Sequence, residues 1–408
     1  MSDYRVGLLG HGTVGSAFDR LLAERADAIA AATGRRPRLS GVLTRSRGSF
    51  EQILEDSDAI VELMGGLEPA REHLRRALEA GKPVVTANKQ LLSQHGDELF
   101  AAAREAGAQL RYEASVAGVV PVIRVMRESF AGAHIEKVYG IVNGTTNFIL
   151  TEMARTGAAY EDALSRAQEL GYAEPDPTED VTGKDAAAKM AILARLAFHT
   201  SVHLDQVPYD GVQEITPDDI DYAKELGLVL KLLGVAERLE GGISVRVFPC
   251  FLYGGHPLAS VLGPFNAVTL ESPAITEITL SGPGAGGLVT ASAVLGDVVS
   301  VMSSSGMQLE PIEELPLVPG TEVESAFYLH LEVADRPGVL AETAKALGDN
   351  EVSVKSVVQK GLGANARLVM VVHPVREGHF AKALEEISRL EFLRAPPRAI
   401  RVIEEEFV

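Results

Sequence analysis

The chain has 408 residues, of which 46% are hydrophobic and 23% are charged, and its formal net charge is −18. This length is too great for one ordinary hydrophobic core, so we expect two or three domains. The composition is typical of a soluble globular protein, and the negative charge argues against a surface that binds nucleic acid or anionic membranes. A single cysteine, Cys250, excludes an intramolecular disulfide and, with no signal peptide in view, favours the reducing cytoplasm.

The N-terminal segment predicts a dinucleotide-binding turn. An apolar strand pattern over residues 4–9 leads into the sequence GHGTVG, and a helix pattern covers residues 16–32. GxGxxG alone is a weak signal, and the strand before it and the helix after it are the context that strengthens it. We expect a pyrophosphate at the N-terminus of that helix. The residues predicted to bind the cofactor are Gly10, Gly12, Thr13, Val14 and Gly15.

A second strand, expected over residues 39–44, ends in Thr44, Arg45, Ser46 and Arg47. Proteins specific for NAD usually carry an acidic residue near this point, where it binds the ribose hydroxyls. Two arginines and a serine can instead hold a 2′-phosphate, so the segment predicts a preference for NADP. The alternative is a basic turn that contacts only solvent.

Alternating strand and helix patterns continue beyond this turn. Strands are expected over residues 58–64 and 83–86, with a helix over 68–80 between them, and a further strand over 110–113. The alternation predicts an α/β fold with a doubly wound parallel sheet of the Rossmann type. Lys89 follows the fourth strand, at the edge where such sheets bind ligands, although a lysine there is more often a surface residue at a helix start.

From about residue 132 the pattern becomes mixed α+β. A strand over 135–142 leads into a polar turn over 143–147, which contains Thr145, and then into a helix over 148–154. The glycine pattern of the first domain does not recur, so we expect a substrate domain. Its other expected elements are a helix over 160–170 and strands near 243–252 and 267–280.

A helix within residues 171–196 carries an unusual charge pair. Asp185, Lys189, Ile192 and Leu196 lie at steps of four, three and four residues, so they share one helix face. The Asp–Lys pair therefore continues an apolar stripe, which is an uncommon place for two charges.

A structural interpretation of the same helix stays open. Thr182 is a candidate N-cap with Asp185 in a capping box, and an exposed Asp–Lys pair contributes only about 0.2–0.5 kcal/mol. Lys184 and Arg195 are expected on a different face, directed toward water.

The C-terminal third predicts a second small domain. A glycine-rich segment over 281–287, which contains Gly284, precedes a helix over 288–302, and its glycines either close over the cofactor or form a hinge. Beyond it, the order strand–helix–strand–strand–helix–strand is typical of a ferredoxin-like domain. The predicted domains are 1–131, with the helix 288–302 packed back on it, 132–305 and 326–408, with a linker over 306–325.

Taken together, these motifs resemble those of the homoserine dehydrogenase family in its long form with a C-terminal ACT domain. The resemblance covers essentially the whole chain. GTTN and the EPDP…D…G.D…K pattern are specific, whereas the glycine turn alone is not, and ADRPGVLAETAKAL carries the similarity to ACT domains. The other matching segments are VGLLGHGTVG, ELMGGLEPAR, VVTANKQLL, YEASVAGVVPVI, GIVNGTTNFILTEM, GYAEPDPTEDVTGKDAAAKMAIL and SGPGAGGLVTASAVLGDV.

The resemblance implies reversible, NAD(P)-dependent interconversion of L-aspartate 4-semialdehyde and L-homoserine, on the route to threonine, isoleucine and methionine. It places the acid/base lysine at Lys189, with Asp185 beside it, and Lys89 next to nicotinamide and substrate. The implied substrate-binding residues are Glu174, Asp180 and Thr145. The implied site for a monovalent cation, often sodium, consists of Glu113 and the backbone carbonyls of Val116, Gly118 and Val120.

For the C-terminal domain the resemblance implies binding of an effector, with threonine expected. Its candidate contacts are Asp335, Pro337 and Gly338. The alternative is that this domain only promotes oligomerisation, and we expect a homodimer or homotetramer.

Two other functions stay open. One is a dehydrogenase for another small amino-acid aldehyde, against which the intact substrate motif argues. The other is a non-catalytic amino-acid sensor, which would have no need for Lys189, Asp185, Glu174 and Lys89 together. His11 departs from the apolar or small residue usual in the family's glycine turn, and cofactor choice varies within the family, so NAD remains an alternative to NADP.

Overall fold

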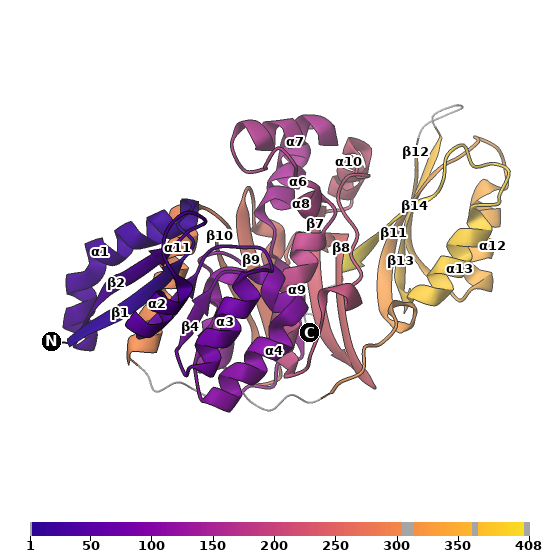
Figure 1. The fold of residues 1–408 in the computed structure, drawn as a ribbon. Coiled ribbons are helices and arrows are strands. Elements are labelled where there is room, and N and C mark those ends of the chain that lie inside the picture. Colours follow the sequence, from indigo (N-terminus) through magenta and orange to yellow (C-terminus); the bar gives the residue numbers. More distant parts are fainter. Residues whose placement is uncertain (1, 304–313, 361–365, 404–408) are drawn as a thin grey trace. The chain divides into compact units, whose positions relative to one another are not determined.

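The computed structural model describes residues 2–303, 314–360 and 366–403 (Figure 1). The chain divides into two compact units that alternate along the sequence. Unit 1 comprises residues 1–144, 184–208 and 264–315, and unit 2 comprises residues 145–183, 209–263 and 316–408.

Unit 1 contains the predicted parallel sheet. Its five strands lie in the order β2-β1-β3-β4-β5, and every neighbouring pair is parallel. The order reverses direction at β1, so the crevice where such sheets bind nucleotides lies at the carboxyl ends of β1 and β3. The strands are β1 (Ser2–Leu9), β2 (Arg35–Leu43), β3 (Ala59–Glu62), β4 (Val84–Thr86) and β5 (Leu110–Arg111).

Helices cover both faces of this sheet because its strands are apolar on both faces. Val6 and Leu8 of β1 pack on one face against Phe18 and other residues of α1 and α11. Gly7 points to the opposite face, where a β-carbon would lie 2.5 Å from Ile53 of α2. The helices of this region are α1 (Thr13–Thr33), α2 (Phe50–Asp56), α3 (Ala70–Glu79), α4 (Lys89–Ala106) and α11 (Gly287–Ser303).

The rest of unit 1 adds three antiparallel strands in the order β10-β9-β6. The strand expected over 267–280 is in fact a hairpin of β9 and β10, because the chain turns at 273–275 and Thr276 has a positive φ of 56°. The expected strand over 110–113 ends after two residues, and η1 follows it. The elements are η1 (Glu113–Ser115), α5 (Val122–Arg124), η2 (Val125–Ser129), β6 (Lys137–Ile141), α9 (Lys184–Phe198), η3 (Leu204–Gln206), β9 (Phe265–Ser272) and β10 (Thr276–Pro283).

Unit 2 begins with helices and an antiparallel hairpin of β7 and β8. β7 was not predicted from the sequence, because both of its faces are buried over most of its length and no alternation marks it. The elements are α6 (Gly144–Thr156), α7 (Tyr160–Glu169), α8 (Thr178–Val181), α10 (Pro217–Glu225), β7 (Leu228–Leu239), β8 (Gly242–Tyr253) and η4 (Pro257–Ser260).

The polar turn expected over 143–147 is also wrong, since α6 begins at Gly144. Polar side chains in a first turn often bond to their own backbone and oppose the helix. Here they bond elsewhere: Thr145 Oγ1 donates to Tyr172 O at 2.7 Å, and Asn147 Nδ2 donates to Gly263 O at 2.9 Å. The helix is therefore longer than its apolar pattern indicates.

Unit 2 ends in the predicted ferredoxin-like domain, with strands in the order β14-β11-β13-β12. Its core includes Phe327 and Phe380, whose rings stack 3.8 Å apart. Only part of the predicted linker falls in the described residues, and there Ile243 N donates to Pro316 O at 2.9 Å. The elements are η5 (Gly320–Glu322), β11 (Glu324–Glu332), α12 (Val339–Asp349), β12 (Val354–Lys360), β13 (Arg367–Arg376), α13 (Glu377–Ile387) and β14 (Arg398–Ile403).

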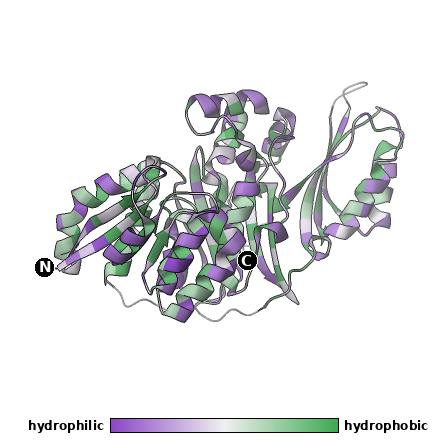
Figure 2. Ribbon diagram, viewed as in Figure 1, coloured by the Kyte–Doolittle hydropathy of each residue, from purple (hydrophilic) through white to green (hydrophobic). Residues whose placement is uncertain are grey.

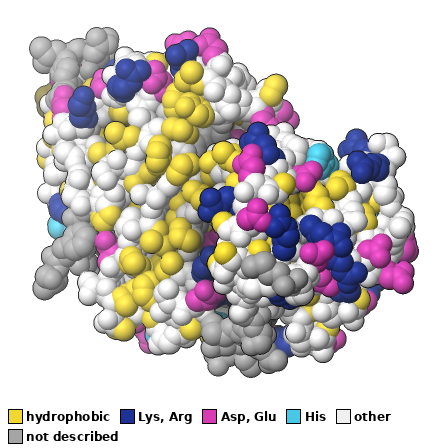
Figure 3. All heavy atoms as spheres, turned by 90° about the vertical axis from the view of Figure 1, so that its left-hand side faces the viewer, with side chains coloured by type: hydrophobic (Ala, Val, Ile, Leu, Met, Phe, Trp, Pro, Cys, Tyr) yellow, Lys and Arg dark blue, Asp and Glu magenta, His cyan; other side chains and the backbone are white. Residues whose placement is uncertain are grey.

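Hydropathy and charge follow this architecture. Strands are mainly hydrophobic and most helices alternate hydrophobic and hydrophilic residues (Figure 2). Among the helices described, none is sufficiently long and apolar to cross a bilayer. On the face shown in Figure 3, Lys and Arg side chains lie among Asp and Glu side chains, so charges of both signs are interspersed there.

Candidate active site

The glycine turn after β1 needs its glycines for three different reasons. Gly10 has a φ of 97°, and a β-carbon on it would lie 2.5 Å from the backbone of Leu63, at the end of β3. A β-carbon on Gly15 would collide with the carbonyl oxygen of Gly10. A β-carbon on Gly12 would meet no atom within 4 Å. Gly12 therefore borders open space at the N-terminus of α1, where a phosphate can approach.

The turn after β2 presents two arginines. Thr44 N donates to Arg47 O at 2.8 Å, which closes a tight turn with Arg45 and Ser46 at its tip. Both arginine side chains are exposed, and neither has an ion-pair partner among the described residues. They are free to bind an anion at the carboxyl end of β2.

The ends of β3 and β4 are joined by a buried carboxylate. Glu62 Oε1 accepts from the N–H groups of Met64 and Gly65 at 2.7 and 3.0 Å, and Glu62 Oε2 accepts from Thr86 Oγ1 at 2.6 Å. Burial raises the pKa of this carboxyl group. Asn88 caps α4 through Leu91 N at 3.1 Å. These bonds fix the backbone segment that immediately precedes Lys89.

Lys89 and Lys189 meet at one carboxylate, that of Asp185. Lys189 Nζ donates to Asp185 Oδ2 at 2.6 Å and to Val142 O at 2.7 Å, and Lys89 Nζ pairs with Asp185 Oδ1. Asn143 Nδ2 also donates to Asp185 Oδ2, at 2.8 Å. Lys89 begins α4, Asp185 and Lys189 lie on α9, and Asn143 follows β6. Three separate segments of unit 1 therefore meet here.

The electrostatics of this cluster follow from burial and charge. Asp185 is 3% exposed, and its side chain lies between two ammonium groups. Burial alone raises the pKa of this carboxyl, but Lys189 and Lys89 outweigh burial and hold the pKa far below its usual value. The carboxylate therefore stays ionised and keeps two cations close together. Such a pair of donors can stabilise negative charge on an oxygen atom.

The alternative interpretation of this helix is wrong. Thr182 Oγ1 donates to Thr178 O at 2.7 Å and does not cap α9, while the carboxylate of Asp185 is buried with the lysines. Arg195 is not directed toward water either, because α4 packs against α9 and supplies Asp97, which pairs with Arg195. The charge pair on the apolar stripe is buried, as the stripe indicated.

A second buried cluster surrounds Glu113. Its two carboxylate oxygens accept from the N–H groups of Ile123 and Arg124 at 2.9 and 2.8 Å, and Glu113 N donates to Asp297 Oδ2 at 2.8 Å. Burial, together with the charge of Asp297, raises the pKa of Glu113 to about 7. The guanidinium of Arg124 pairs with Asp297 Oδ1 at 3.2 Å, and no cationic side chain among the described residues forms an ion pair with Glu113.

The backbone after Glu113 forms a tight turn. Ala117 and Gly118 both have positive φ, and the carbonyl oxygen of Val120 accepts from Val122 N at 2.8 Å. A β-carbon on Gly118 would lie 2.5 Å from the carbonyl oxygen of Gly284. Within the described ranges no group of three or more His, Cys, Asp or Glu side chains is arranged to hold a metal. A cation here would instead depend on Glu113 and backbone carbonyls.

The glycine-rich segment before α11 packs against Asn266 and against Thr13 of the glycine turn, both in unit 1. A β-carbon on Gly284 would overlap Asn266, and one on Gly287 would lie 3.0 Å from Thr13 in the glycine turn. Asn266 Nδ2 in turn donates to Val142 O at 3.3 Å, the carbonyl that also accepts from Lys189. The glycines thus permit this segment to pack closely against Asn266 and Thr13.

The predicted substrate and effector residues lie in unit 2. Glu174 is exposed and Asp180 is half-buried in α8, whereas Thr145 is buried in the first turn of α6. Pro337 and Gly338 are exposed, and Gly338 has a φ of 95° where α12 begins.

Several contributing residues were not singled out from the sequence. Asn143 donates to Asp185, and Asp297 accepts from Glu113 N. Glu62 and Asn88 bond to the backbone or side chains of segments next to Lys89. Asp297 had a visible signal, because it is the one charge within the apolar helix pattern over 288–302. The others required knowledge of which strand ends adjoin.

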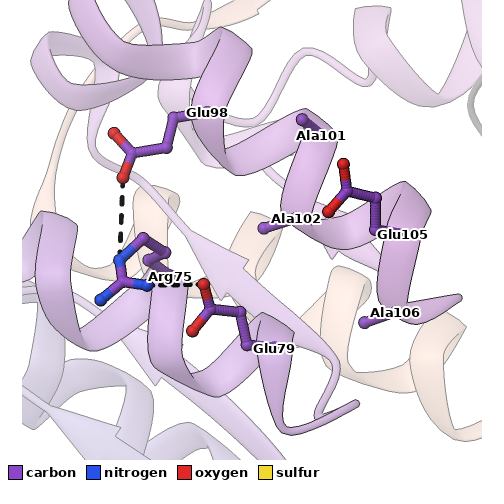
Figure 4. Close-up of a pocket in the computed structure, with 7 residues that line it drawn as sticks. All are labelled: Arg75, Glu79, Glu98, Ala101, Ala102, Glu105 and Ala106. Atoms are coloured by element: carbon purple, nitrogen blue, oxygen red, sulfur yellow. Dashed lines mark hydrogen bonds and ion pairs between the residues drawn. The ribbon is translucent and has the colours of Figure 1, made fainter.

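A cavity of about 460 Å³ between α3 and α4 is separate from these clusters. Figure 4 shows Arg75 between Glu79 and Glu98, which it pairs with at 2.5 and 3.7 Å. The cavity lining has one arginine, Arg75, and three glutamates, and none of its lining residues belongs to the lysine or Glu113 cluster.

A glycine turn at the reversal point of a parallel sheet, together with paired ammonium groups on a buried carboxylate, defines a dinucleotide-binding oxidoreductase. Comparison with known proteins identifies the family within this class. The family models for homoserine dehydrogenase, its NAD-binding domain and the ACT domain match residues 121–299, 10–113 and 328–392. The chain belongs to the homoserine dehydrogenase family.

Relatives of full length agree with this assignment. Homoserine dehydrogenase of Mycobacterium tuberculosis is 42% identical, with 97% of each chain covered, and that of Neisseria gonorrhoeae is 36% identical, with 98% of this chain and 99% of the relative covered. The crystal structure of homoserine dehydrogenase from Thiobacillus denitrificans has a TM-score of 0.94 and 37% identity, with 99% of each chain covered. A hyperthermophilic archaeal homoserine dehydrogenase in complex with NADPH has a TM-score of 0.65 and 26% identity, covering 76% of this chain and all of that chain.

Proposed function

We propose that this chain catalyses the reversible NAD(P)-dependent interconversion of L-aspartate 4-semialdehyde and L-homoserine, on the route to threonine, isoleucine and methionine. The observation that carries the proposal is the junction of Lys89 and Lys189 at Asp185. When hydride reaches the carbonyl carbon of the aldehyde, its oxygen gains negative charge and must receive a proton. An ammonium held at that oxygen lowers the barrier and supplies the proton.

In this mechanism Lys189 is the acid for aldehyde reduction and the base for homoserine oxidation. Its ammonium is held by Val142 O and Asp185 Oδ2, and its side chain is 13% exposed. Lys89 is more exposed, at 32%, and contributes positive charge beside nicotinamide and substrate. Asp185 holds both lysine side chains in place. Glu174, Asp180 and Thr145 bind the amino-acid part of the substrate, with the carboxylates directed to its ammonium.

The bound nicotinamide cofactor supplies or accepts the hydride. Gly10, Gly12, Thr13, Val14 and Gly15 bind its pyrophosphate at the N-terminus of α1, and the backbone at Gly284 closes the same region. Arg45 binds a 2′-phosphate, which favours NADP over NAD. The exposed, unpaired state of the arginine supports this preference, as does the NADPH named for the archaeal neighbour.

A monovalent cation, most simply sodium, fits the cluster at Glu113. Glu113 and Asp297 are both buried, and Arg124 compensates only one of the two carboxylates. The carbonyl oxygens of Val116 and Gly118 accept no hydrogen bond from the described residues, so they are available as ligands, with Val120 as the third carbonyl. The cation would neutralise the excess charge and stiffen the turn next to Gly284.

The ACT domain adds regulation and assembly to this activity. We expect feedback inhibition by threonine, with Asp335, Pro337 and Gly338 as effector contacts, and a homodimer or homotetramer. The cytoplasm is the expected compartment, because the chain has a single cysteine, Cys250, which is free.

The test compares homoserine-dependent NADP reduction by the wild type, Lys189→Ala and Lys184→Ala. Removing a general acid/base group typically costs about 10²–10⁴-fold in turnover. We expect that loss in Lys189→Ala, with NADP binding retained, and near wild-type turnover in Lys184→Ala, which removes a lysine from another face of the same helix.

Turnover by Lys189→Ala within threefold of the wild type would contradict the role of Lys189 and favour Lys89. Absence of wild-type turnover with either cofactor would contradict the proposed reaction and favour an amino-acid sensor.

A further inference from the structure

The two helices that carry the lysine cluster are joined at a second place. α4 begins with Lys89 and α9 carries Asp185, and the two helices pack side by side in unit 1 (Figure 1). Besides the pair of Lys89 with Asp185, Asp97 on α4 pairs with Arg195 on α9. None of the functions assigned above uses this second pair.

Arg195 is held by more than the ion pair. Its side chain is only 11% exposed, and its guanidinium carbon lies 4.4 Å from the ring centroid of Phe100, which is also on α4. Arg195 Nη1 donates to Ser201 Oγ at 3.3 Å as well. A guanidinium that lies over an aromatic ring and bonds to two oxygen atoms has few other orientations, so Arg195 is a rigid contact between the two helices.

Asp97 is held from the segment that follows α9. Ser201 Oγ donates to Asp97 Oδ2 at 2.6 Å, and His203 Nε2 lies 3.1 Å from the same oxygen. Burial raises the pKa of this carboxyl group, but the bonds from Ser201 and Arg195 outweigh burial, and the pKa is lowered. Asp97 is therefore a carboxylate at neutral pH, and it ties α4 both to α9 and to the chain beyond α9.

The two ion pairs fix the register of α4 on α9. Asp97 follows Lys89 on α4, and Arg195 follows Asp185 on α9, so the helices run in the same direction and are tied at two points about two to three turns apart. Between these points α4 is kinked at His95, where φ is −131° and ψ is 18°. Because the helix is not continuous there, contacts on both sides of the kink are needed to hold its first segment along α9.

The position of Lys89 depends on this register more than that of Lys189 does. Lys89 reaches Asp185 from another helix, whereas Lys189 lies on the same helix as Asp185, one turn away. A lysine side chain is a flexible four-carbon stem, so its ammonium is placed by the backbone that carries it and by its partner. A shift of the first segment of α4 therefore moves Lys89 away from Asp185 and leaves Lys189 paired.

We propose that Asp97 and Arg195 are positioning residues that hold Lys89 at Asp185. They act through the register of α4 on α9 and not through contact with substrate or cofactor. Loss of either one releases Lys89 and leaves the pair of Lys189 with Asp185 in place. The effect on turnover rests on the proposed function, in which Lys89 contributes positive charge beside nicotinamide and substrate, whereas the position of Lys89 can be measured without it.

The first experiment follows Lys89 by chemical labelling of the full chain. Brief treatment with acetic anhydride is followed by mass spectrometry of the peptides, with the exposed Lys382 on α13 as the internal reference. The reagent attacks the neutral amine, so an ammonium held at a carboxylate reacts slowly. Labelling of Lys89 relative to Lys382 should rise about threefold or more in Asp97→Asn and in Arg195→Gln, because release from Asp185 favours the neutral amine. Equal labelling of Lys89 in the wild type and in both variants would overturn the proposal.

Glu98→Gln is the matched control. Glu98 follows Asp97 on α4 and also forms an ion pair, but its partner is Arg71 on α3, whose Nε donates to it at 2.7 Å. The substitution removes the same charge from α4 without altering the contact with α9, so the labelling of Lys89 should stay as in the wild type. An equal rise in Glu98→Gln would show that any lost charge on α4 releases Lys89, which contradicts the proposal. The side chain of Asp97 is 43% exposed, so Asp97→Asn retains the test if the more buried Arg195→Gln does not fold.

Homoserine-dependent NADP reduction then measures the consequence for turnover. In Asp97→Asn we expect kcat to fall about fivefold or more while KM for NADP is unchanged, and in the Lys89→Ala background the same substitution should have little further effect, because the residue that it positions is already absent. Equal losses of kcat in both backgrounds would show that Asp97 acts independently of Lys89 and would overturn the proposal. Absence of wild-type turnover would contradict the proposed reaction instead, and the labelling of Lys89 would still decide the position of its side chain.

Discussion

The ammonium of Lys189 lies 2.6 Å from the carboxylate of Asp185, one turn earlier on the same helix, and both are withdrawn from solvent. Because Lys89 binds the other oxygen of that carboxylate, one buried negative charge organises two cations. The arrangement differs from a surface ion pair, in which each partner is hydrated and the pair contributes little.

Asp185→Asn should destabilise the protein as well as inactivate it. The substitution leaves two ammonium groups without their counter-charge, and breaking a buried pair from one side typically costs about 3–5 kcal/mol. Denaturant unfolding at neutral pH measures this loss. Glu179→Gln, which removes a charge from a more exposed position on α8, is the control and should change stability by less than about 1 kcal/mol.

The same variant tests the pH dependence of stability. The pKa of Asp185 is lowered in the folded protein, so its contribution is complete above the unfolded value of about 3.9 and is lost as pH falls toward the folded value. The difference in unfolding free energy between wild type and Asp185→Asn should therefore be constant above about pH 5 and should shrink as pH falls from about 4 to about 2. A difference that is constant over this range would contradict the assignment.

Sodium should stabilise the wild type more at high pH than at low pH. The pKa of Glu113 is raised to about 7, so the folded state retains a proton that the unfolded chain has lost, and stability falls as pH rises from about 4.3 to about 7. A cation favours the carboxylate and offsets this loss. Melting temperatures with sodium chloride or choline chloride at about pH 5 and about pH 8 provide the measurement. Glu113→Gln should abolish the pH dependence of the sodium effect, and an undiminished effect in that variant would exclude Glu113 as the ligand.

Gly12→Ala and Gly15→Ala should separate cofactor binding from folding. The new methyl group at Gly12 meets no protein atom, so the melting temperature should stay unchanged while NADP affinity falls about tenfold or more, because the phosphate loses its close approach. At Gly15 the methyl group collides with the carbonyl of Gly10, so stability should fall too. Equal NADP affinity in Gly12→Ala and wild type would show that the pyrophosphate does not approach this glycine.

Arg45→Ala should change cofactor preference. Loss of a charge-assisted contact to the 2′-phosphate typically costs about 1.5–3 kcal/mol, or roughly 10–150-fold in KM for NADP, with little change in KM for NAD. Arg38→Ala is the matched control, since Arg38 lies on β2 but pairs with Asp3 at 2.7 Å. If both cofactors weaken equally in Arg45→Ala, the arginine does not discriminate between them.

Local pattern was sufficient for much of this fold. The glycine turn, the β–α alternation and the order of the ACT elements follow from periodicity and turn chemistry, which act between near neighbours. The helix stripe also placed Asp185 and Lys189 on one buried face. By contrast, β7 was missed, because burial on both faces removes the alternation that marks a strand. The hairpin of β9 and β10 was taken as one strand, because the turn at 273–275 was not recognised.

The sequence by itself determined which residue types are available: the glycines of the cofactor turn, the lysines and the acidic groups. Only the tertiary structure decided that Lys89 reaches Asp185, 96 residues away, and that Asn143 completes the same cluster. These outcomes depend on which strand ends adjoin and on how much water is excluded. Both are properties of packing between distant segments, and local propensity does not predict them.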